Sequence, residues 1–382
     1  MTSSDLHAYF DGQLDAMVDL LKDLAAIESP TTDKAAVDRM SERVAEELDR
    51  LGGDLKVHPR TAVGDIVEAR WNADRPGRPL LFVCHMDTVH PIGAIAQNPI
   101  RAEDGKLRGP GTYDMKSSIV TVIAALHGLR EMGIFPDRPF IALMTTDEET
   151  GSFDSRELIQ ERAREAALAM IMEPALPDGS LKTSRKSTAN FSVRTYGTAA
   201  HAGGAHESGL NAIEEMAHQI LALQAMTDYK VGSTVSVGMI NGGTARNTVP
   251  DFCEAAVDAR AMTVDEMARM TTLITSLTPK LPNARVEVDG GFDRPPMERN
   301  ALMIETFNRA KEIGAKYGLT LREAGSGGGS DGNYTAALGT PTLDGLGPIG
   351  DGAHSEREHI LIHSLAISAT LLAGILLEWP KD

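Results

Sequence analysis

From the start of the chain to about residue 172, short apolar runs alternate with stretches whose apolar residues recur at helical spacing. The clearest runs are residues 80–84, 140–145 and 168–172, and residues 117–132 have the helical spacing. Because strands alternate with helices in this way, the pattern predicts an α/β fold with a mainly parallel sheet and helices on both of its faces.

The pattern changes after residue 183. From there to residue 290 it predicts strands at 189–195, 233–240, 254–260 and 284–289, with helices at 210–226 and 264–277. The resulting order, βαββαβ, fits a ferredoxin-like module inserted into the first domain. Helical patterns at 300–317 and 360–378 then return to the main sheet. We therefore predict a discontinuous domain of residues 1–183 and 291–382, and a second domain of residues 184–290.

Composition supports this division and narrows the classes of partner. A chain of 382 residues that is 42% hydrophobic has enough apolar side chains for two cores. Acidic residues outnumber basic ones by 54 to 37, so nucleic acid and anionic membranes are not expected partners. No basic-then-apolar leader and no run of roughly 18 apolar residues is present, which predicts a cytoplasmic protein. Cys84 and Cys253 are expected to pack as small hydrophobes.

Acidic and imidazole side chains follow the predicted strands and turns at five separate places. They are His85 with Asp87, Asp114, Glu148 with Glu149, Glu173 and His354. Open α/β sheets collect their sites at the carboxyl ends of the strands, so we expect these side chains to form one two-metal site. A lone His-x-Asp or Glu-Glu pair is more often a solvated surface feature, and it is the joint occurrence that favours the metal site.

The order of these segments, with their flanking residues, resembles the M20 family of zinc aminopeptidases, carboxypeptidases and amidohydrolases over nearly the whole chain. Within the family it resembles the glutamate carboxypeptidase (carboxypeptidase G2-like) branch. The resemblance implies two Zn²⁺ per subunit, with Co²⁺ or Mn²⁺ as substitutes. It implies that Asp114 bridges the ions, that His85 and Glu173 hold one, and that Glu149 and His354 hold the other.

The resemblance also assigns roles beside the metals. It makes Glu148 the general base and then the acid, and it makes Asp87 the residue that orients the imidazole of His85. A cis peptide bond is implied between Asp114 and Met115. His201, in the segment 197–203, is implied to reach across a homodimer and stabilise the oxyanion of the neighbouring site. A lone histidine would otherwise cap or pack.

Substrate-binding residues are implied at three further places. Asn247 matches a residue lent by the partner subunit, although a turn asparagine before a strand is an equally good explanation. Arg260 matches the arginine that grips the terminal carboxylate of the substrate. Backbone N–H groups of the segment containing Gly327, Gly328 and Ser330 would approach the same carboxylate, whereas a glycine run elsewhere is usually a flexible linker.

The resemblance narrows the function to hydrolysis of the amide before a C-terminal amino acid with a free carboxylate. Arg294 falls where glutamate carboxypeptidases bind the glutamate side chain, although it could instead anchor a hinge. These enzymes also carry a lysine where this chain has Ser180 or Leu181. Glutamate is therefore our first prediction for the released residue. Acetylornithine deacetylase, succinyl-diaminopimelate desuccinylase, aminoacylase and broad dipeptidase activities stay open.

A non-enzymatic alternative is a silent metal-binding module that acts through its dimer surface. Such a module would be free to lose its base, so the presence of Glu148 beside all five ligands favours the enzyme. The expected partners are a small anionic peptide or N-acyl amino acid and a second copy of the chain.

Overall fold

A computed structural model describes residues 3–381 and divides the chain into two compact units. Unit 1 comprises Met1–Thr183, Arg299–Gly325 and Ser330–Asp382, and unit 2 comprises Ser184–Glu298 and Ser326–Gly329. The inserted segment was predicted at 184–290. Unit 2 extends further because its last strand continues to Arg294 and because Met297 then pairs with Arg185.

Unit 1 is built around an eight-stranded sheet with the order β1-β2-β6-β3-β7-β16-β8-β15. The strands are β1 (Asp54–His58), β2 (Ile66–Trp71), β3 (Leu80–His85), β6 (Phe140–Thr145), β7 (Leu168–Ile171), β8 (Leu181–Arg185), β15 (Glu323–Ser326) and β16 (Thr342–Asp344). The central strands β6, β3, β7 and β16 are parallel, while β1, β2 and β8 pair antiparallel. The mainly parallel α/β sheet predicted from the sequence is confirmed.

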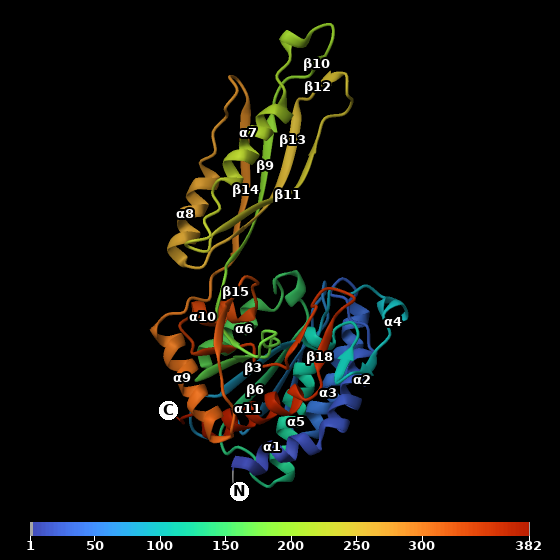
Figure 1. Ribbon diagram of the computed structural model, residues 1–382, viewed down its shortest axis with the longest axis vertical. Coiled ribbons are helices and arrows are strands. Elements are labelled where there is room, and N and C mark those ends of the chain that lie inside the picture. The colour runs from blue at the N-terminus through green and yellow to red at the C-terminus, as the bar shows by residue number, and fades with distance from the viewer. Residues whose placement is uncertain (1–2, 382) are drawn as a thin grey trace. The chain divides into compact units, whose positions relative to one another are not determined.

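Helices cover both faces of this sheet (Figure 1). They are α1 (Ser3–Gly12), α2 (Leu14–Ala25), α3 (Lys34–Arg50), α4 (Ala94–Gln97), α5 (Ser117–Glu131), α6 (Arg156–Glu165), α9 (Ala301–Lys316), α10 (Asp331–Ala337) and α11 (Ser364–Glu378). Alternation along β3 explains the layers, because Leu80 and Phe82 join the core beneath α5 and α11 while Leu81 and Val83 join the core beneath α6. A strand buried on both faces requires the continuous apolar run seen in the sequence.

A smaller four-stranded sheet in unit 1 corrects one predicted element. It has the order β17-β18-β5-β4, formed by β17 (Gly350–Asp351), β18 (His359–Leu361), β5 (Lys106–Arg108) and β4 (Arg101–Glu103). We predicted a helix from residue 360, which is wrong for its first residues. Ile360 is fully buried and pairs with Leu107 in this sheet, and the helix α11 begins at Ser364.

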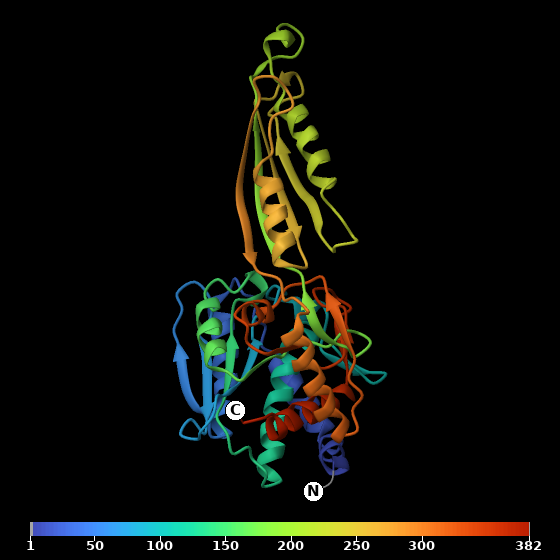
Figure 2. The same ribbon diagram turned by 90° about the vertical axis from the view of Figure 1, so that its left-hand side faces the viewer.

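Unit 2 has the predicted βαββαβ order. Its elements are β9 (Thr188–Tyr196), α7 (Ala212–Gln224), β11 (Thr234–Gly242), β13 (Phe252–Arg260), α8 (Val264–Thr275) and β14 (Arg285–Arg294), with a two-stranded sheet of β10 (Ala200–His201) and β12 (Thr248–Val249). The four long strands pair antiparallel in the order β11-β13-β9-β14. Figure 2 shows α7 and α8 on one face of this sheet. This order and pairing are those of a ferredoxin-like fold.

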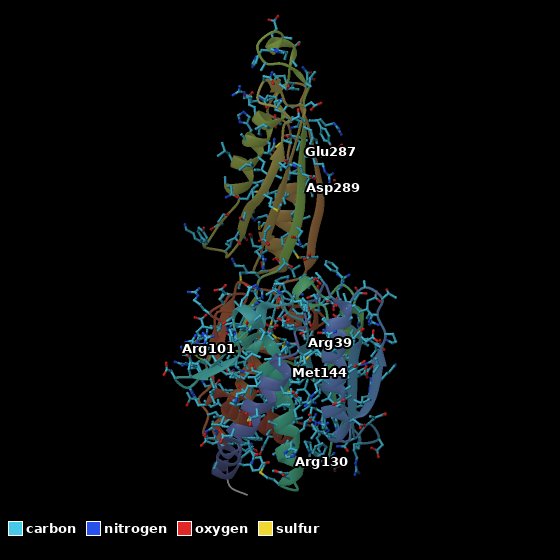
Figure 3. All side chains as sticks on the ribbon, turned by 90° about the vertical axis from the view of Figure 1, so that its right-hand side faces the viewer. Arg39, Arg101, Arg130, Met144, Glu287 and Asp289 are labelled. Carbon is cyan, nitrogen blue, oxygen red and sulfur yellow. The ribbon has the colours of Figure 1, made fainter. Side chains whose placement is uncertain are left out.

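The other face of the unit 2 sheet carries charged side chains. Arg194 on β9 pairs with Glu254 on β13 and with Asp289 on β14, and Tyr196 donates a hydrogen bond to Glu287. Figure 3 labels Glu287 and Asp289 on this ladder. Alternating charged residues on one face and apolar residues on the other are typical of an antiparallel sheet with one solvated side.

Two further predictions from the sequence concern the cysteines and membrane-spanning helices. Cys84 and Cys253 are both buried and free, as predicted. Among the helices of residues 3–381, none has the combination of length and apolar character that crossing a bilayer needs.

Candidate metal centre

Three neighbouring parallel strands bring four acidic or imidazole side chains to one edge of the unit 1 sheet. His85 is the last residue of β3, Glu173 follows β7, and Glu148 and Glu149 form a short 3₁₀ turn, η2 (Glu148–Thr150), after β6. Because β6, β3 and β7 are adjacent and parallel, their carboxyl ends meet. The predicted clustering of ligands therefore follows from strand order.

The remaining two candidate ligands come from turns. Asp114 lies in an irregular helical turn, η1 (Thr112–Lys116), that leads directly into α5, and the Asp114–Met115 peptide bond is cis, as the resemblance implied. His354 lies between β17 and β18 and has a φ of 61°. That left-handed conformation costs a non-glycine residue about 1–2 kcal/mol, so packing and contacts around the turn must hold it there.

The two oxygens of the Asp114 carboxylate face two different imidazoles. Oδ1 lies 3.0 Å from Nε2 of His85, and Oδ2 lies 3.4 Å from Nε2 of His354. Each imidazole faces a second carboxylate, because Nε2 of His85 is 3.6 Å from Oε1 of Glu173 and Nε2 of His354 is 3.1 Å from Oε2 of Glu149. The five side chains therefore form two imidazole–carboxylate pairs joined through Asp114.

Crowding of acidic groups perturbs these side chains. Hydrogen bonds to Asp114 and Glu149 raise the pKa of His354 to about 10, although partial burial opposes this. Burial, with the charge of Asp114, raises the pKa of Glu149 to about 7 against the hydrogen bond from His354. Burial alone would lower the pKa of His85, but hydrogen bonds to Asp114 and Asp87 raise it well above its usual range. The surroundings therefore favour the protonated forms of His354, Glu149 and His85.

The donor set fits divalent cations. Ligand atoms of His85, Asp114 and Glu149 all lie within 4.8 Å of one another, and so do those of His85, Glu148 and Glu173. Two imidazoles with several carboxylates suit zinc, and one carboxylate whose oxygens face opposite imidazoles suits a bridging role. Binding of cations to these side chains would displace the protons from them.

Asp87 supports both the imidazole and the turn that carries the glutamates. Its side chain is completely buried and accepts hydrogen bonds from Thr31 Oγ1 at 2.6 Å and from the backbone N–H groups of Glu148 and Glu149 at 3.3 and 3.2 Å. Nδ1 of His85 lies 3.4 Å from Oδ1 of Asp87 and closer, at 3.0 Å, to its backbone carbonyl. Both contacts fix the ring so that Nε2 faces the centre.

Glu148 and Glu149 occupy the same turn, and both carboxylates approach the ligand cluster. Proximity alone does not separate a base from a ligand here. The division of roles between them, with Glu148 as base, stays a prediction.

Unit 2 brings His201 and Asn247 together. His201 ends β10, Asn247 directly precedes β12, and the N–H of Ala202 donates to the backbone carbonyl of Asn247 at 2.9 Å. Nδ1 of His201 accepts from the N–H groups of Gly203 and Gly204 at 3.1 and 3.0 Å. In the neutral ring the proton is therefore on Nε2, which makes the exposed edge of His201 a hydrogen-bond donor.

The other predicted substrate residues have protein partners. Arg260, at the end of β13, is paired with Asp258 at 2.9 Å, and Arg294 is buried at the end of β14. The loop with Gly327 and Gly328 is tied to Arg185, whose Nη1 donates to the carbonyl of Gly328 at 3.2 Å.

Ser330 is buried, accepts from Gly332 N and donates to Asp344 at 2.6 Å, so its hydroxyl caps α10. Roles of these residues toward a substrate stay predictions.

Two buried ionisable residues behind the centre, Glu358 and Lys116, were not predicted from the sequence. Glu358 and Lys116 are both almost completely buried; burial lowers the pKa of Lys116 to about 8, and its ammonium donates to the carbonyl of Ile27 at 2.6 Å. Glu358 accepts hydrogen bonds from the turn that carries Asp114. Lys116 could have been recognised from the sequence, because a lysine directly after Asp114–Met115 stands inside an apolar helical pattern. No sequence signal marks Glu358.

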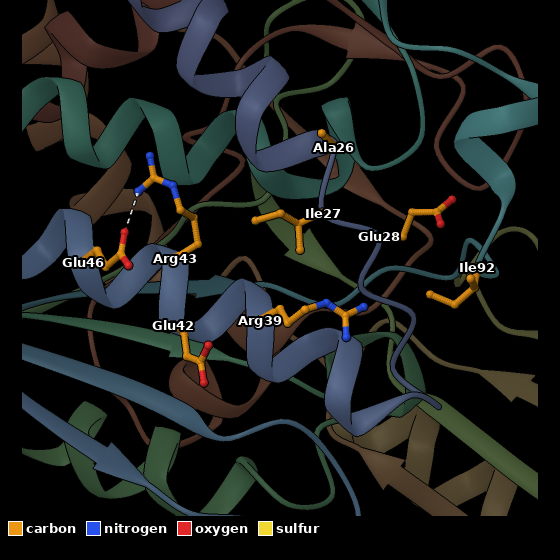
Figure 4. Close-up of a pocket in the computed structure, with 8 residues that line it drawn as sticks. All are labelled: Ala26, Ile27, Glu28, Arg39, Glu42, Arg43, Glu46 and Ile92. Atoms are coloured by element: carbon orange, nitrogen blue, oxygen red, sulfur yellow. Dashed lines mark ion pairs between the residues drawn. The ribbon is translucent and has the colours of Figure 1, made fainter.

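A cavity of about 490 Å³ opens elsewhere on unit 1 and contains none of the candidate ligands. Figure 4 shows its lining, where Arg43 pairs with Glu46 and where Arg39 and Glu28 face the same space. Glu28 already accepts from Gly93 N and Ile95 N at 2.8 and 2.9 Å. The candidate ligands therefore lie at the strand ends and not in this cavity.

Comparisons with known proteins agree with the geometry. Residues 81–378 match peptidase family M20/M25/M40. Carboxypeptidase G2 of Pseudomonas sp. (strain RS-16) is 31% identical over 95% of this chain and 89% of its own length, and succinyl-diaminopimelate desuccinylase of Bordetella pertussis is 26% identical over 92% and 94%. The crystal structure of aminopeptidase PepT from Bacillus cereus superposes with a TM-score of 0.78 at 24% identity, covering 95% of this chain and 98% of that one.

Proposed function

Because the chain belongs to peptidase family M20/M25/M40, whose members are metal-dependent hydrolases, we propose that it hydrolyses the amide before a C-terminal amino acid with a free carboxylate. The membership confirms the family expected from the order of the ligands. Glutamate is the first candidate for the released residue, supported by the similarity to carboxypeptidase G2 and by the presence of Arg260 and Arg294. The observation that carries the proposal is the Asp114 carboxylate, whose two oxygens face His85 and His354.

Two divalent cations, with zinc as the first candidate, would be held by His85, Asp114, Glu149, Glu173 and His354. When bound, they supply Lewis acidity that polarises the amide carbonyl and makes water more acidic. Glu148 takes the proton from the attacking water and delivers it to the departing amine. His201 donates its Nε2 proton in a hydrogen bond to the oxyanion. The guanidinium groups of Arg260 and Arg294 hold substrate carboxylates, for which a planar fork of donors is well suited.

A substrate panel tests this function. Zinc-loaded protein is incubated with N-aroyl, N-acetyl and N-succinyl amino acids and with dipeptides, and the freed amino acid is identified. Preferential release of glutamate, abolished by a chelator and restored by metal, is the expected result. Release of other residues would move the protein to an aminoacylase, deacetylase, desuccinylase or dipeptidase, and no turnover of any substrate would favour the silent metal-binding module.

We further propose a homodimer in which His201 and Asn247 serve the partner's site. β11 is an edge strand of unit 2, and its side chains Met239 and Ile240 are 73% and 54% exposed. Leu221, on the neighbouring helix α7, is 71% exposed. An exposed apolar edge strand is a ready surface for pairing with another chain.

Complementation tests both the dimer and the direction in which His201 acts. The variants His201→Asn and Glu148→Gln are purified separately and then mixed under conditions that exchange subunits. If His201 serves the partner, a mixed dimer contains one complete site and activity returns. If His201 serves its own chain, or if the protein is monomeric, the mixture stays inactive. The cytoplasmic location stays a prediction from the sequence.

A further inference from the structure

Glu358 is a completely buried carboxylate directly behind the bridging residue. Oε1 accepts hydrogen bonds from the backbone N–H groups of Tyr113 and Asp114 at 2.9 and 3.0 Å, and Oε2 accepts from Gly111 N at 3.0 Å. Oε2 also lies 2.6 Å from Nε2 of His90. One side chain therefore contacts three amides of the turn that carries Asp114, including the amide of Asp114 itself.

The backbone N–H groups at the start of this turn need a hydrogen-bond acceptor from outside the turn. The first N–H groups of a helical turn have no intrahelical partner, and here three such groups point at a single carboxylate. Gly111 has a φ of 69°, and a Cβ at that position would meet the methyl group of Thr88 at 2.9 Å, so the start of the turn requires glycine. Hydrogen bonds from backbone N–H to an ionised carboxylate are stronger than neutral ones, which favours glutamate over glutamine at position 358.

Two further side chains interact with Glu358. His90 contacts the carboxylate from the segment that follows Asp87, and the buried ammonium of Lys116 interacts with it electrostatically from the end of the same turn. Glu358 therefore holds the turn carrying Asp114 from behind, and His90 in turn holds Glu358. A bridging carboxylate must place both oxygens correctly at once, so its backbone position matters more than that of a ligand to one ion.

We propose that Glu358, supported by His90, is a positioning residue that fixes the Asp114 carboxylate for bridging two cations. This inference rests on the metal centre of the proposed function. Glu358 acts through the backbone of residues 111–114 and contacts neither cation nor substrate. Loss of the Glu358 charge is expected to impair the binding of two cations together, while each half of the centre keeps its imidazole and its glutamate.

The test uses Co²⁺ added to the metal-free full chain. Stoichiometry and dissociation constants are measured by competition with a chelator, together with the visible spectrum of the Co²⁺ form and the melting temperature without metal. The variants are Glu358→Gln, His90→Ala and His90→Gln, since glutamine at position 90 keeps a donor for Glu358. Glu356→Gln, which removes the same charge from an exposed position on the same segment, is the matched control.

We expect Glu358→Gln to weaken Co²⁺ binding by about 10–100-fold and to change the Co²⁺ spectrum, because the partners of metal ligands typically contribute that much. His90→Ala should have a smaller effect in the same direction, His90→Gln should restore binding, and Glu356→Gln should match the wild type. Wild-type affinity and spectrum in folded Glu358→Gln would overturn the inference. If that variant does not fold, equal affinities in His90→Ala, His90→Gln and the wild type would overturn it instead. Fewer than two ions per wild-type chain would overturn the metal centre itself.

Discussion

Removal of metal should make the stability of unit 1 fall as pH rises. Hydrogen bonds to Asp114 and Glu149 raise the pKa of His354 from 6.5 to about 10, and burial raises that of Glu149 from 4.5 to about 7. Between the unfolded and folded pKa values, the folded metal-free chain binds more protons than the unfolded chain. The free energy of unfolding therefore decreases with pH across these windows.

The sign follows for each group separately. A group whose pKa is higher in the folded chain than in the unfolded chain contributes stability that is complete below the unfolded pKa and is lost as pH rises through the folded pKa. The contribution of Glu149 therefore disappears between pH 4.5 and about 7, and that of His354 between pH 6.5 and about 10. The steepest possible slope is about 1.4 kcal/mol per pH unit for each proton. Because the His354 side chain is 54% exposed, solvent screening reduces its share, and we expect a loss of about 1–2 kcal/mol.

Intrinsic fluorescence can follow this loss in unit 1 alone. The chain has two tryptophans, Trp71 and Trp379, and both are buried in unit 1. Urea unfolding midpoints of chelator-treated protein are measured at pH 6.5, 7.5 and 9 for the wild type and for His354→Gln. His127→Gln, which removes an exposed imidazole from α5, is the control. The formal charge of -17 lowers the stability of every variant at high pH, so the quantity that decides is the difference between variants.

The advantage of the wild type over His354→Gln should shrink as pH rises, while His127→Gln should follow the wild type. Addition of Zn²⁺ should reverse the trend in the wild type, because cations compete better with protons at high pH. A wild-type advantage that stays constant or grows between pH 6.5 and 9 would refute the claim that Asp114 and Glu149 hold His354 in its charged form.

Three further predictions concern single side chains. Glu148→Gln should lower kcat by about 10²–10⁴-fold without changing the metal content, as measured by steady-state kinetics and metal analysis. The control Glu157→Gln, on the exposed face of α6, should leave kcat unchanged. Loss of metal from Glu148→Gln would instead make Glu148 a ligand. His201→Asn should lower kcat by about 10²–10³-fold with an unchanged unfolding midpoint, and normal kcat would exclude it from the reaction. Asp87→Asn should weaken metal binding by about 10–100-fold in chelator competition, and unchanged affinity would contradict its support of His85.

The clustering of the candidate ligands could be predicted from the sequence because strand order determines where these side chains meet. His85, Glu149 and Glu173 each follow an apolar run, and runs of that length buried on both faces occur in parallel sheets. The short strands β17 and β18 lack such a run, and the apolar residues of β18 adjoin those of α11 in the sequence. For this reason the start of the helix was predicted too early, although His354 just before it was assigned as a ligand.

The residues that hold the candidate ligands in place could not be predicted in the same way, and Glu358 shows why. It lies in the run Ser355-Glu356-Arg357-Glu358-His359, whose composition is typical of a solvated surface segment. Within that run Glu356 and Arg357 are exposed and only Glu358 is completely buried. What buries it is three backbone amides and an imidazole from residues 90–114, far away along the chain. Backbone amides carry no sequence signal, so an acid that binds them can be recognised only once the turn they belong to has been located in space.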